Sequence, residues 1–168
     1  LTAKGPFCSD EYSVIVKITS ACGNFPEPVQ EAFTSTKKLF LSRDLIALPG
    51  GFIIHCGSQL QRPMVTKWDE FGNLIWHRVT TDNGSFNQIE ATPDGNFLLV
   101  GQSSGKMQVT KMDGDGNFLW AKTLENTEGS YWTIRQTDVL AVNPDGTFGL
   151  LFVDNYVNKR YLAKLSPD

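Results

Sequence analysis

The chain has 168 residues, of which 40% are hydrophobic and 20% are charged, proportions typical of a globular domain with one core. Its formal net charge of −3 creates no positive field that would attract a nucleic-acid backbone. No apolar run approaches the roughly 20 residues that a membrane-spanning helix requires. We therefore expect neither nucleic-acid binding nor direct insertion into a membrane.

Residues 1–38 predict a half unit of β structure followed by a linker. Residues 14–19 have the apolar character of a strand, and residues 21–25 contain a glycine and an asparagine that suit a tight hairpin. No segment of the chain sustains helical spacing of apolar residues over ten positions.

Three longer units follow, which we place at residues 39–82, 83–126 and 127–168. The middle unit shows most clearly how each is built. Its apolar runs, separated by glycine-containing turns, predict four strands at 89–92, 97–101, 107–112 and 118–124. The preceding unit has the same order, and the last unit contains only the first three of these strands.

One phrase recurs along the chain with a fixed spacing. The segment 65–76 returns as 109–120, a shift of 44 residues, and self-similarity at such a period indicates an array of similar units. In each copy an aspartate and a glycine are predicted to form a hairpin turn, and a tryptophan to pack between neighbouring units. These structural positions are Asp69, Gly72 and Trp76 in the first copy, and Asp113, Gly116 and Trp120 in the second.

Four strands in about 44 residues are typical of a β-propeller blade. The motif D-x-x-G-N-x-x-W, present in both copies, resembles bacterial propeller repeats of the broad quinoprotein-dehydrogenase-like group, which are common in secreted and surface proteins. The resemblance implies an all-β fold, a partial β-propeller of about three and a half four-stranded antiparallel blades. It also implies an extracellular, cell-surface or periplasmic location.

Propellers close with about 4 to 8 blades, more than this sequence contains. We therefore expect the chain to be a fragment of a longer polypeptide, with closure by a second copy as the alternative.

Three aromatic residues are candidates for contact with a partner. The segment from Ile134 to Asp145 is six residues longer than its counterpart in the middle unit, and it follows two aromatic residues. Phe86, Tyr131 and Trp132 lie by position on the side of the array where propellers often carry their ligand site, so we expect them to bind a protein or a sugar. The alternative is that they pack between blades.

Asp113, Asp115 and Asn117 place three oxygen-bearing side chains on alternate positions, as hard cations such as calcium prefer. The alternative is a turn stabilised by its own side chains, and we expect no other cofactor. His55 and His77 have no ligand or nucleophile partner at a suitable spacing, so we interpret both as structural and identify no catalytic residue.

The three cysteines leave at least one without an intramolecular partner. Cys8 with Cys56 is the disulfide that we prefer, because the repeat places both on one side of the array. The alternative is that the cysteines are buried free thiols.

These observations predict a non-catalytic protein-interaction or ligand-binding scaffold of a secreted or cell-surface protein. Its partners would be other polypeptide chains or the remaining blades of the same protein. Two alternatives stay open: a part of a quinoprotein-like or carbohydrate-active propeller enzyme, and a structural spacer in a surface adhesin.

Overall fold

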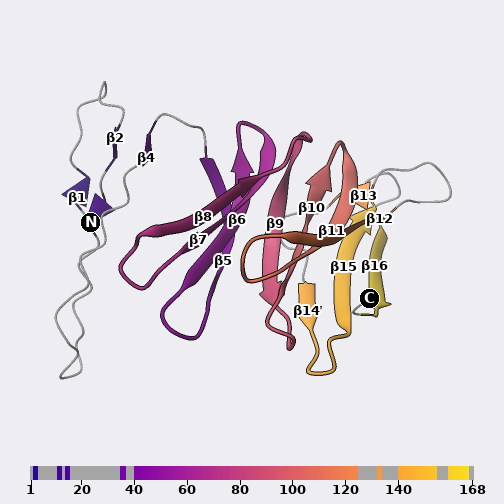
Figure 1. The fold of residues 1–168 in the computed structure, drawn as a ribbon. Helices are drawn as coiled ribbons and strands as arrows, with labels where there is room; N and C mark the ends of the chain where they lie inside the picture. The colour runs from indigo at the N-terminus through magenta and orange to yellow at the C-terminus, as the bar shows by residue number, and fades with distance from the viewer. Residues whose placement is uncertain are drawn as a thin grey trace.

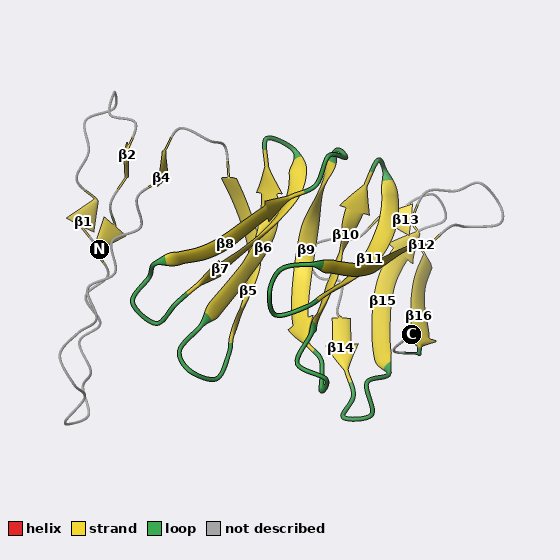
Figure 2. Cartoon of the chain, in the orientation of Figure 1, coloured by secondary structure: helices red, strands yellow, loops and turns green. Residues whose placement is uncertain are grey.

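The protein consists of antiparallel β-sheets. The computed structural model describes residues 40–124, 140–154 and 159–166, together with strand segments at 2–3, 11–12, 14–15, 35–36 and 132–133. These residues contain strands and turns and no helix, which confirms the predicted all-β fold, and Figure 2 shows strands joined mostly by short loops. In this part of the chain, therefore, no helix has the length and apolar character needed to cross a membrane.

Three larger sheets follow one another along the chain (Figure 1). The first sheet contains β5 (Phe40–Ala47), β6 (Ile53–Gln59), β7 (Arg62–Trp68) and β8 (Leu74–Val79). The second sheet contains β9 (Gly84–Ala91), β10 (Phe97–Ser103), β11 (Lys106–Met112) and β12 (Phe118–Leu124). In both, each strand pairs with the next in antiparallel fashion.

The third sheet is centred on β15 (Phe148–Asp154). On one side β15 pairs with β16 (Lys159–Leu165), and on the other with β13 (Trp132–Thr133) and β14 (Leu140–Val142). Two small strand pairs precede the larger sheets. They join β1 (Thr2–Ala3) to β3 (Val14–Ile15) and β2 (Glu11–Tyr12) to β4 (Ser35–Thr36).

The core lies between the stacked sheets. Alternate residues of a strand point to opposite faces, so the second sheet uses one face against the first sheet and the other against the third. The first interface contains Ile54, Cys56, Val65 and Trp76 against Phe86, Ile89, Phe97, Leu99 and Met112. The second contains Leu98, Val100, Met107 and Val109 against Leu140, Phe148, Leu150 and Phe152.

A β-bulge occurs at the same place in the first two sheets. In β5 the pairing shifts across Arg43, and in β9 it shifts across Asn87, 44 residues later. The extra residue changes the alternation of faces, so Phe86 and Ile89, three residues apart, both enter the core. Opposite this bulge, a Cβ on Gly101 would lie 2.1 Å from the carbonyl oxygen of Ser85, so only glycine fits there.

One predicted strand boundary was wrong. The first strand of the middle unit was predicted to begin at residue 89, but β9 begins at Gly84. The predicted strand at 14–19 is described only at Val14–Ile15, which pairs with β1, and the predicted hairpin at 21–25 lies outside the described residues.

Candidate functional site

Trp76 in β8 shows how one sheet docks on the next. Its indole lies on the backbone of Gly116, where an added Cβ would be 2.9 Å from the ring. The indole Nε1 donates a hydrogen bond to the carbonyl oxygen of Gly114 at 3.3 Å. Trp76 is 8% exposed, so the ring fills the space between the first sheet and the β11–β12 turn of the second.

Two cations of the first sheet bind the same turn. The Lys67 ammonium donates to the carbonyl oxygen of Gly114 at 3.0 Å. The Arg78 guanidinium donates to the carbonyl oxygens of Gly116 at 3.0 Å and Asp115 at 3.3 Å, and it lies over the Trp76 ring at 5.6 Å. A tryptophan, an arginine and a lysine thus satisfy three backbone carbonyls of the neighbouring sheet.

The turn owes its shape to Asp113. Its carboxylate accepts hydrogen bonds from the backbone amides of Asp115 at 3.0 Å and Asn117 at 2.8 Å, and from the Asn117 side chain at 2.9 Å. Gly116 has a φ of +84°, which glycine adopts at little cost. The hydrogen bonds from Asn117 hold the pKa of Asp113 below its usual value.

The first sheet carries the same turn. Asp69 accepts hydrogen bonds from the amides of Phe71 at 2.9 Å and Asn73 at 2.7 Å, and from the Asn73 side chain at 2.9 Å. The Asn73 side chain is the main reason why the pKa of Asp69 is lowered. Gly72 has a φ of +79°, but no atom lies within 4 Å of the position that its Cβ would take.

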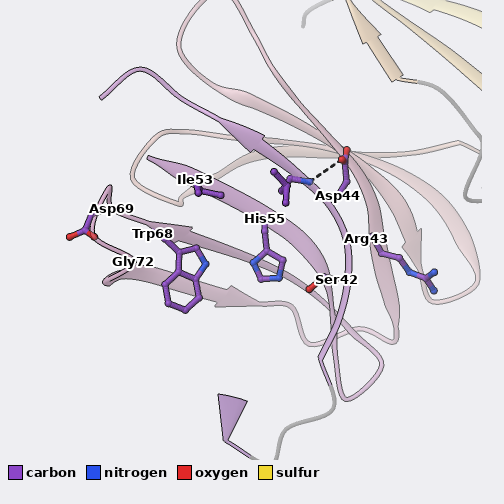
Figure 3. Close-up of a pocket in the computed structure, with 9 residues that line it drawn as sticks. Ser42, Arg43, Asp44, Ile53, His55, Trp68, Asp69 and Gly72 are labelled. Atoms are coloured by element: carbon purple, nitrogen blue, oxygen red, sulfur yellow. Dashed lines mark hydrogen bonds between the residues drawn. The ribbon is translucent and has the colours of Figure 1, made fainter. Parts of the chain in front are cut away.

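A pocket of about 550 Å³ lies beside the turn at Asp69 (Figure 3). Its walls come from β5, β6, the end of β7 and the β7–β8 turn. The imidazole of His55 and the indole of Trp68 lie next to each other in it. The lining residues are Ser42, Arg43, Asp44, Leu45, Ile53, His55, Trp68, Asp69 and Gly72.

We define the outer face of the first sheet by four of these residues: Leu45, Ile53, His55 and Trp68. Each has a counterpart exactly one repeat further along the chain in the second sheet. The counterparts Ile89, Phe97, Leu99 and Met112 are all no more than 2% exposed, because the first sheet covers them. Leu45, by contrast, is 63% exposed, and Ile53, His55 and Trp68 are half-buried. The pocket therefore occupies the position that corresponds to a filled interface.

His55 adds a polar group to this pocket. Its Nε2 atom is buried and has no hydrogen-bond partner. Burial lowers the pKa of His55, and the nearby His77 lowers it further. His77 itself is held by the Thr66 hydroxyl at 2.9 Å and the Gln59 side-chain oxygen at 2.8 Å.

Of the three predicted binding aromatics, the structure describes the side chain of Phe86 alone. Phe86 is 2% exposed and belongs to the core between the first two sheets, which corrects the expectation of an exposed contact and agrees with packing between units. Trp132 pairs with Asp154 in the third sheet, and Tyr131 lies outside the described residues. Trp120 is half-buried against the third sheet, with Lys122 over its ring at 4.9 Å.

The predicted cation ligands take part in the turn. Asp113 uses both carboxylate oxygens for hydrogen bonds within it, as the alternative to calcium binding predicted. Within the described ranges, no group of three or more His, Cys, Asp or Glu side chains is arranged to hold a metal ion.

Cys56 is a free, buried thiol, so the preferred disulfide between Cys8 and Cys56 is wrong. The side chain faces the core between the first two sheets, and burial raises its pKa.

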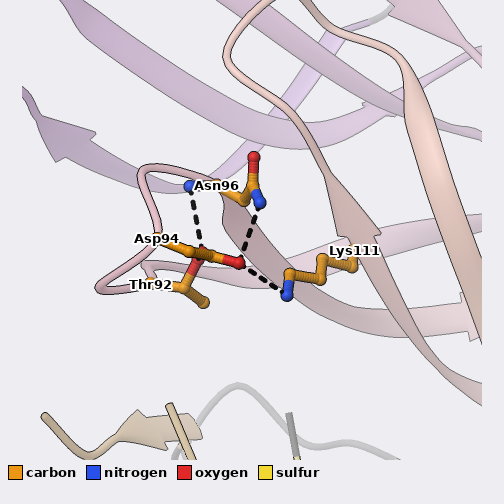
Figure 4. A network of polar contacts seen from close by, with 4 residues as sticks. All are labelled: Thr92, Asp94, Asn96 and Lys111. Carbon is orange, nitrogen blue, oxygen red and sulfur yellow. Dashed lines mark hydrogen bonds and ion pairs between the residues drawn. The ribbon is translucent and has the colours of Figure 1, made fainter. Parts of the chain in front are cut away.

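A second polar cluster surrounds Asp94 in the β9–β10 turn (Figure 4). Its carboxylate pairs with Lys111 at 2.8 Å and accepts hydrogen bonds from the Thr92 hydroxyl and the Asn96 side chain, the latter at 2.9 Å. Lys111 foremost, and then Thr92, lowers the pKa of Asp94. A smaller cavity of about 260 Å³ lies between this turn and the β14–β15 turn at Pro144.

Sequence reasoning missed the outer face, although the repeat contained the signal. Comparing the two units position by position would have shown His55 in place of Leu99 and Ser42 in place of Phe86. The first unit is thus more polar on a face that is apolar in the second.

The fold defines an all-β protein of successive antiparallel sheets. It is similar to the crystal structure of a protein of unknown function from Bacteroides caccae, with a TM-score of 0.49 and 13% sequence identity, over 98% of this chain and 72% of that one. No protein-family model matches the chain, and no curated protein matches it either.

Proposed function

We propose that this chain is a non-catalytic interaction scaffold of a secreted or cell-surface protein, whose sheets are blades of a partial β-propeller. Its binding site is the outer face of the first sheet, and its ligand is a β-strand segment of another chain or of further blades. One observation carries this proposal. The four residues that define this face match, one repeat apart, four residues that the second sheet buries against a neighbouring sheet.

The contacts between the first and second sheets indicate which ligand the outer face of the first sheet would bind. The turn at Asp113 binds an indole, a guanidinium and an ammonium through its backbone carbonyls. The turn at Asp69 has the same internal hydrogen bonds, so its carbonyls have the same directions. The expected ligand is therefore a strand with a tryptophan followed two residues later by a cation, as in β8.

Physical considerations favour such a ligand. An indole can bury about 150–250 Å² in the pocket, and the pocket walls at Leu45, Ile53 and Trp68 are apolar. The cation would meet backbone carbonyls together with the carboxylate of Asp69, a residue that lines the pocket. Apolar anchors with charged groups at the rim are the usual composition of a protein interface.

The probe that tests this function is a cyclic hairpin with the sequence of residues 62–79, closed by a D-Pro-Gly turn. It carries Lys67, Trp76 and Arg78 in their native order. Titrated into the isotope-labelled full chain, it should shift the amide resonances of residues 69–72 and the indole resonance of Trp68. A hairpin with Trp76→Ala and Arg78→Ala should leave these resonances in place.

A pair of protein variants makes the test specific. Gly72→Ala places a methyl group where the indole would dock, and it should weaken hairpin binding at least tenfold. Gly95→Ala is the matched control, since Gly95 has the same φ of +79° and an equally open Cβ position but does not line the pocket. Unmoved resonances with the native hairpin, or equal shifts with both hairpins, would refute the proposal.

A further inference from the structure

Two turns with the same sequence line the cavity between the second and third sheets. The sequence Pro-Asp-Gly occurs at residues 93–95, between β9 and β10, and again at residues 144–146, between β14 and β15. Residues of both turns line this cavity of about 260 Å³. Of the described residues, none lines both this cavity and the pocket beside the turn at Asp69, so the two are separate candidate sites.

The cavity has a buried floor and an exposed rim. Thr92, Leu98 and Lys111 form the floor and are 8%, 1% and 9% exposed. The prolines and aspartates of the two turns are exposed and form the rim. A concave site that combines apolar side chains with a few polar groups is typical of small-molecule binding.

Lys111 is held differently from its counterpart one repeat earlier. Lys67 donates to the carbonyl oxygen of Gly114 at 3.0 Å and so reaches from the first sheet to the second. Lys111 instead pairs with Asp94 of its own sheet at 2.8 Å (Figure 4). The counterpart of Asp94 in the first unit is Gly50, which has no carboxylate. Asp94 thus keeps the ammonium group of Lys111 at the cavity.

The cavity contains hydrogen-bonding groups that the protein does not fully use. An ammonium group has three N–H donors, and Asp94 accepts one of those of Lys111. On the other side, Asp145 accepts from the Thr147 amide at 2.9 Å and the Thr147 hydroxyl at 2.6 Å, both through Oδ1. Its Oδ2 atom has no hydrogen-bond partner among the described residues. The Thr147 side chain lowers the pKa of Asp145, so this carboxylate is ionised and accepts hydrogen bonds at neutral pH.

We propose that this cavity binds a neutral sugar ring, with Lys111 donating to one hydroxyl group and Asp145 accepting from another. An anionic ligand would meet the two rim carboxylates and a cationic ligand would meet Lys111, and like charges in contact are costly. A hydroxyl group both donates and accepts, so neighbouring hydroxyls satisfy both groups without adding charge. The rings of Pro93 and Pro144 would contact the C–H groups of the sugar.

The volume of the cavity limits the size of the ligand. A space of about 260 Å³ would hold on the order of nine water molecules at about 30 Å³ each. It is smaller than the roughly 300–1,000 Å³ of cavities for drug-sized ligands. One six-membered sugar ring would fill it, and a longer oligosaccharide would extend beyond the rim. For so small a ligand we expect millimolar affinity.

Nuclear magnetic resonance of the isotope-labelled full chain tests this site. The probes are the methyl glycosides of glucose, mannose and galactose, each raised to about 50 mM, above the millimolar dissociation constant expected. At least one of them should shift the amide resonances of Gly95 and Gly146 together, because these glycines belong to the two turns of the cavity. Cyclohexanol, which has a six-membered ring and a single hydroxyl group, should leave both resonances in place.

Protein variants identify the groups that bind the sugar. Asp145→Ser keeps an oxygen for the Thr147 amide and removes Oδ2, so it should weaken binding about tenfold. Asp115→Ser is the matched control, since Asp115 is an exposed turn residue that does not line the cavity, and it should leave the affinity unchanged. Lys111→Met removes the ammonium donors and should also weaken binding about tenfold. Near-ultraviolet circular dichroism checks that each variant stays folded.

Any of three results would overturn the sugar site. The first is that none of the three glycosides moves the resonances of Gly95 and Gly146. The second is equal shifts with cyclohexanol, which would show that the cavity does not recognise the hydroxyl groups. The third is unchanged affinity of Asp145→Ser, a variant of an exposed residue that should fold even if Lys111→Met does not.

Discussion

The carboxylate of Asp44 accepts a hydrogen bond from the backbone amide of Ile89 at 3.0 Å and so links β5 of the first sheet to β9 of the second. Gln88, one repeat after Asp44, does the same for the third sheet. Its side-chain oxygen accepts from the amide of Leu140 at 2.7 Å, and its side-chain nitrogen donates to the carbonyl of Leu140 at 3.3 Å. Each first strand is thus tied to the first strand of the next sheet.

This link predicts that Asp44→Ala destabilises the fold by about 1–3 kcal/mol, because the part-buried amide of Ile89 loses its acceptor. Asp44→Asn, which keeps a side-chain oxygen in place, should cost less than half as much. Urea unfolding followed by circular dichroism measures both. Equal stability of Asp44→Ala and the unmodified chain would show that water replaces the carboxylate without cost.

The two equivalent turn glycines should respond differently to alanine. Both have positive φ, so each substitution carries a backbone cost of about 1–2 kcal/mol. Only Gly116 has Trp76 at 2.9 Å from the new methyl group, and overpacking of this kind adds about 1–3 kcal/mol. Thermal unfolding should therefore rank Gly116→Ala well below Gly72→Ala, and the reverse order would contradict the docked position of the indole.

The Asp94 cluster predicts a loss of stability in acid. Because Lys111 and Thr92 lower the pKa of Asp94 in the folded state, its contribution is present above the unfolded pKa and disappears as the pH falls through the folded pKa. Asp94→Asn should cost about 1 kcal/mol at neutral pH and progressively less below pH 4. Urea unfolding at several pH values measures this destabilisation. If the destabilisation by Asp94→Asn did not change with pH, the ion pair with Lys111 would not be its cause.

His55 should titrate below the ordinary histidine range. Burial is the main cause of its lowered pKa, and His77 contributes, so His77→Gln should raise the pKa of His55 only part of the way to its usual value. Since the folded state binds this proton less tightly than the unfolded state, stability should fall as the pH decreases through about 6.5. Nuclear magnetic resonance of the imidazole carbons follows both histidines, and an ordinary pKa for His55 would contradict its buried position.

Cys56 should resist alkylation in the folded protein. The thiolate is the reactive form, and burial raises the pKa of this thiol. Iodoacetamide treatment with peptide mapping should find Cys56 unmodified in buffer and fully modified in concentrated urea. Rapid labelling of Cys56 in buffer would show that its side chain lies outside the core. A disulfide-linked peptide containing Cys8 and Cys56 would show that the disulfide forms after all.

The predictable part of this structure is the part encoded by local patterns. Turn residues such as Asp113 and Gly116 act within a few positions of one another, so their spacing was enough to place the hairpins. The strands of the second unit were located from continuous apolar runs for the same reason. Phe86 was misplaced because the bulge at Asn87, which turns it toward the core, depends on pairing with β10 and has no local sequence signal.

The candidate site was harder to predict because it depends on contacts between units. Residues 69–73 and 113–117 share an aspartate, a glycine and an asparagine at the same positions and form the same internal hydrogen bonds. Their differences at the second and third positions do not indicate that the turn at Asp113 is covered by the first sheet. The preferred cysteine pair failed for a related reason. Proximity along the array was inferred for Cys56, but its side chain points to the face that packs on the second sheet.

The bulge at Asn87 has a consequence for how this chain tolerates insertions and deletions. Strand residues alternate between faces with a period of two. The single extra residue therefore moves the residues on one side of it to the opposite face of the sheet. Deleting Asn87 would restore a regular strand and turn Phe86 out of the core. A length change of one residue in β9 should thus destabilise the fold more than many substitutions do. Adding or removing a whole 44-residue unit would leave each remaining residue on its own face of the sheet.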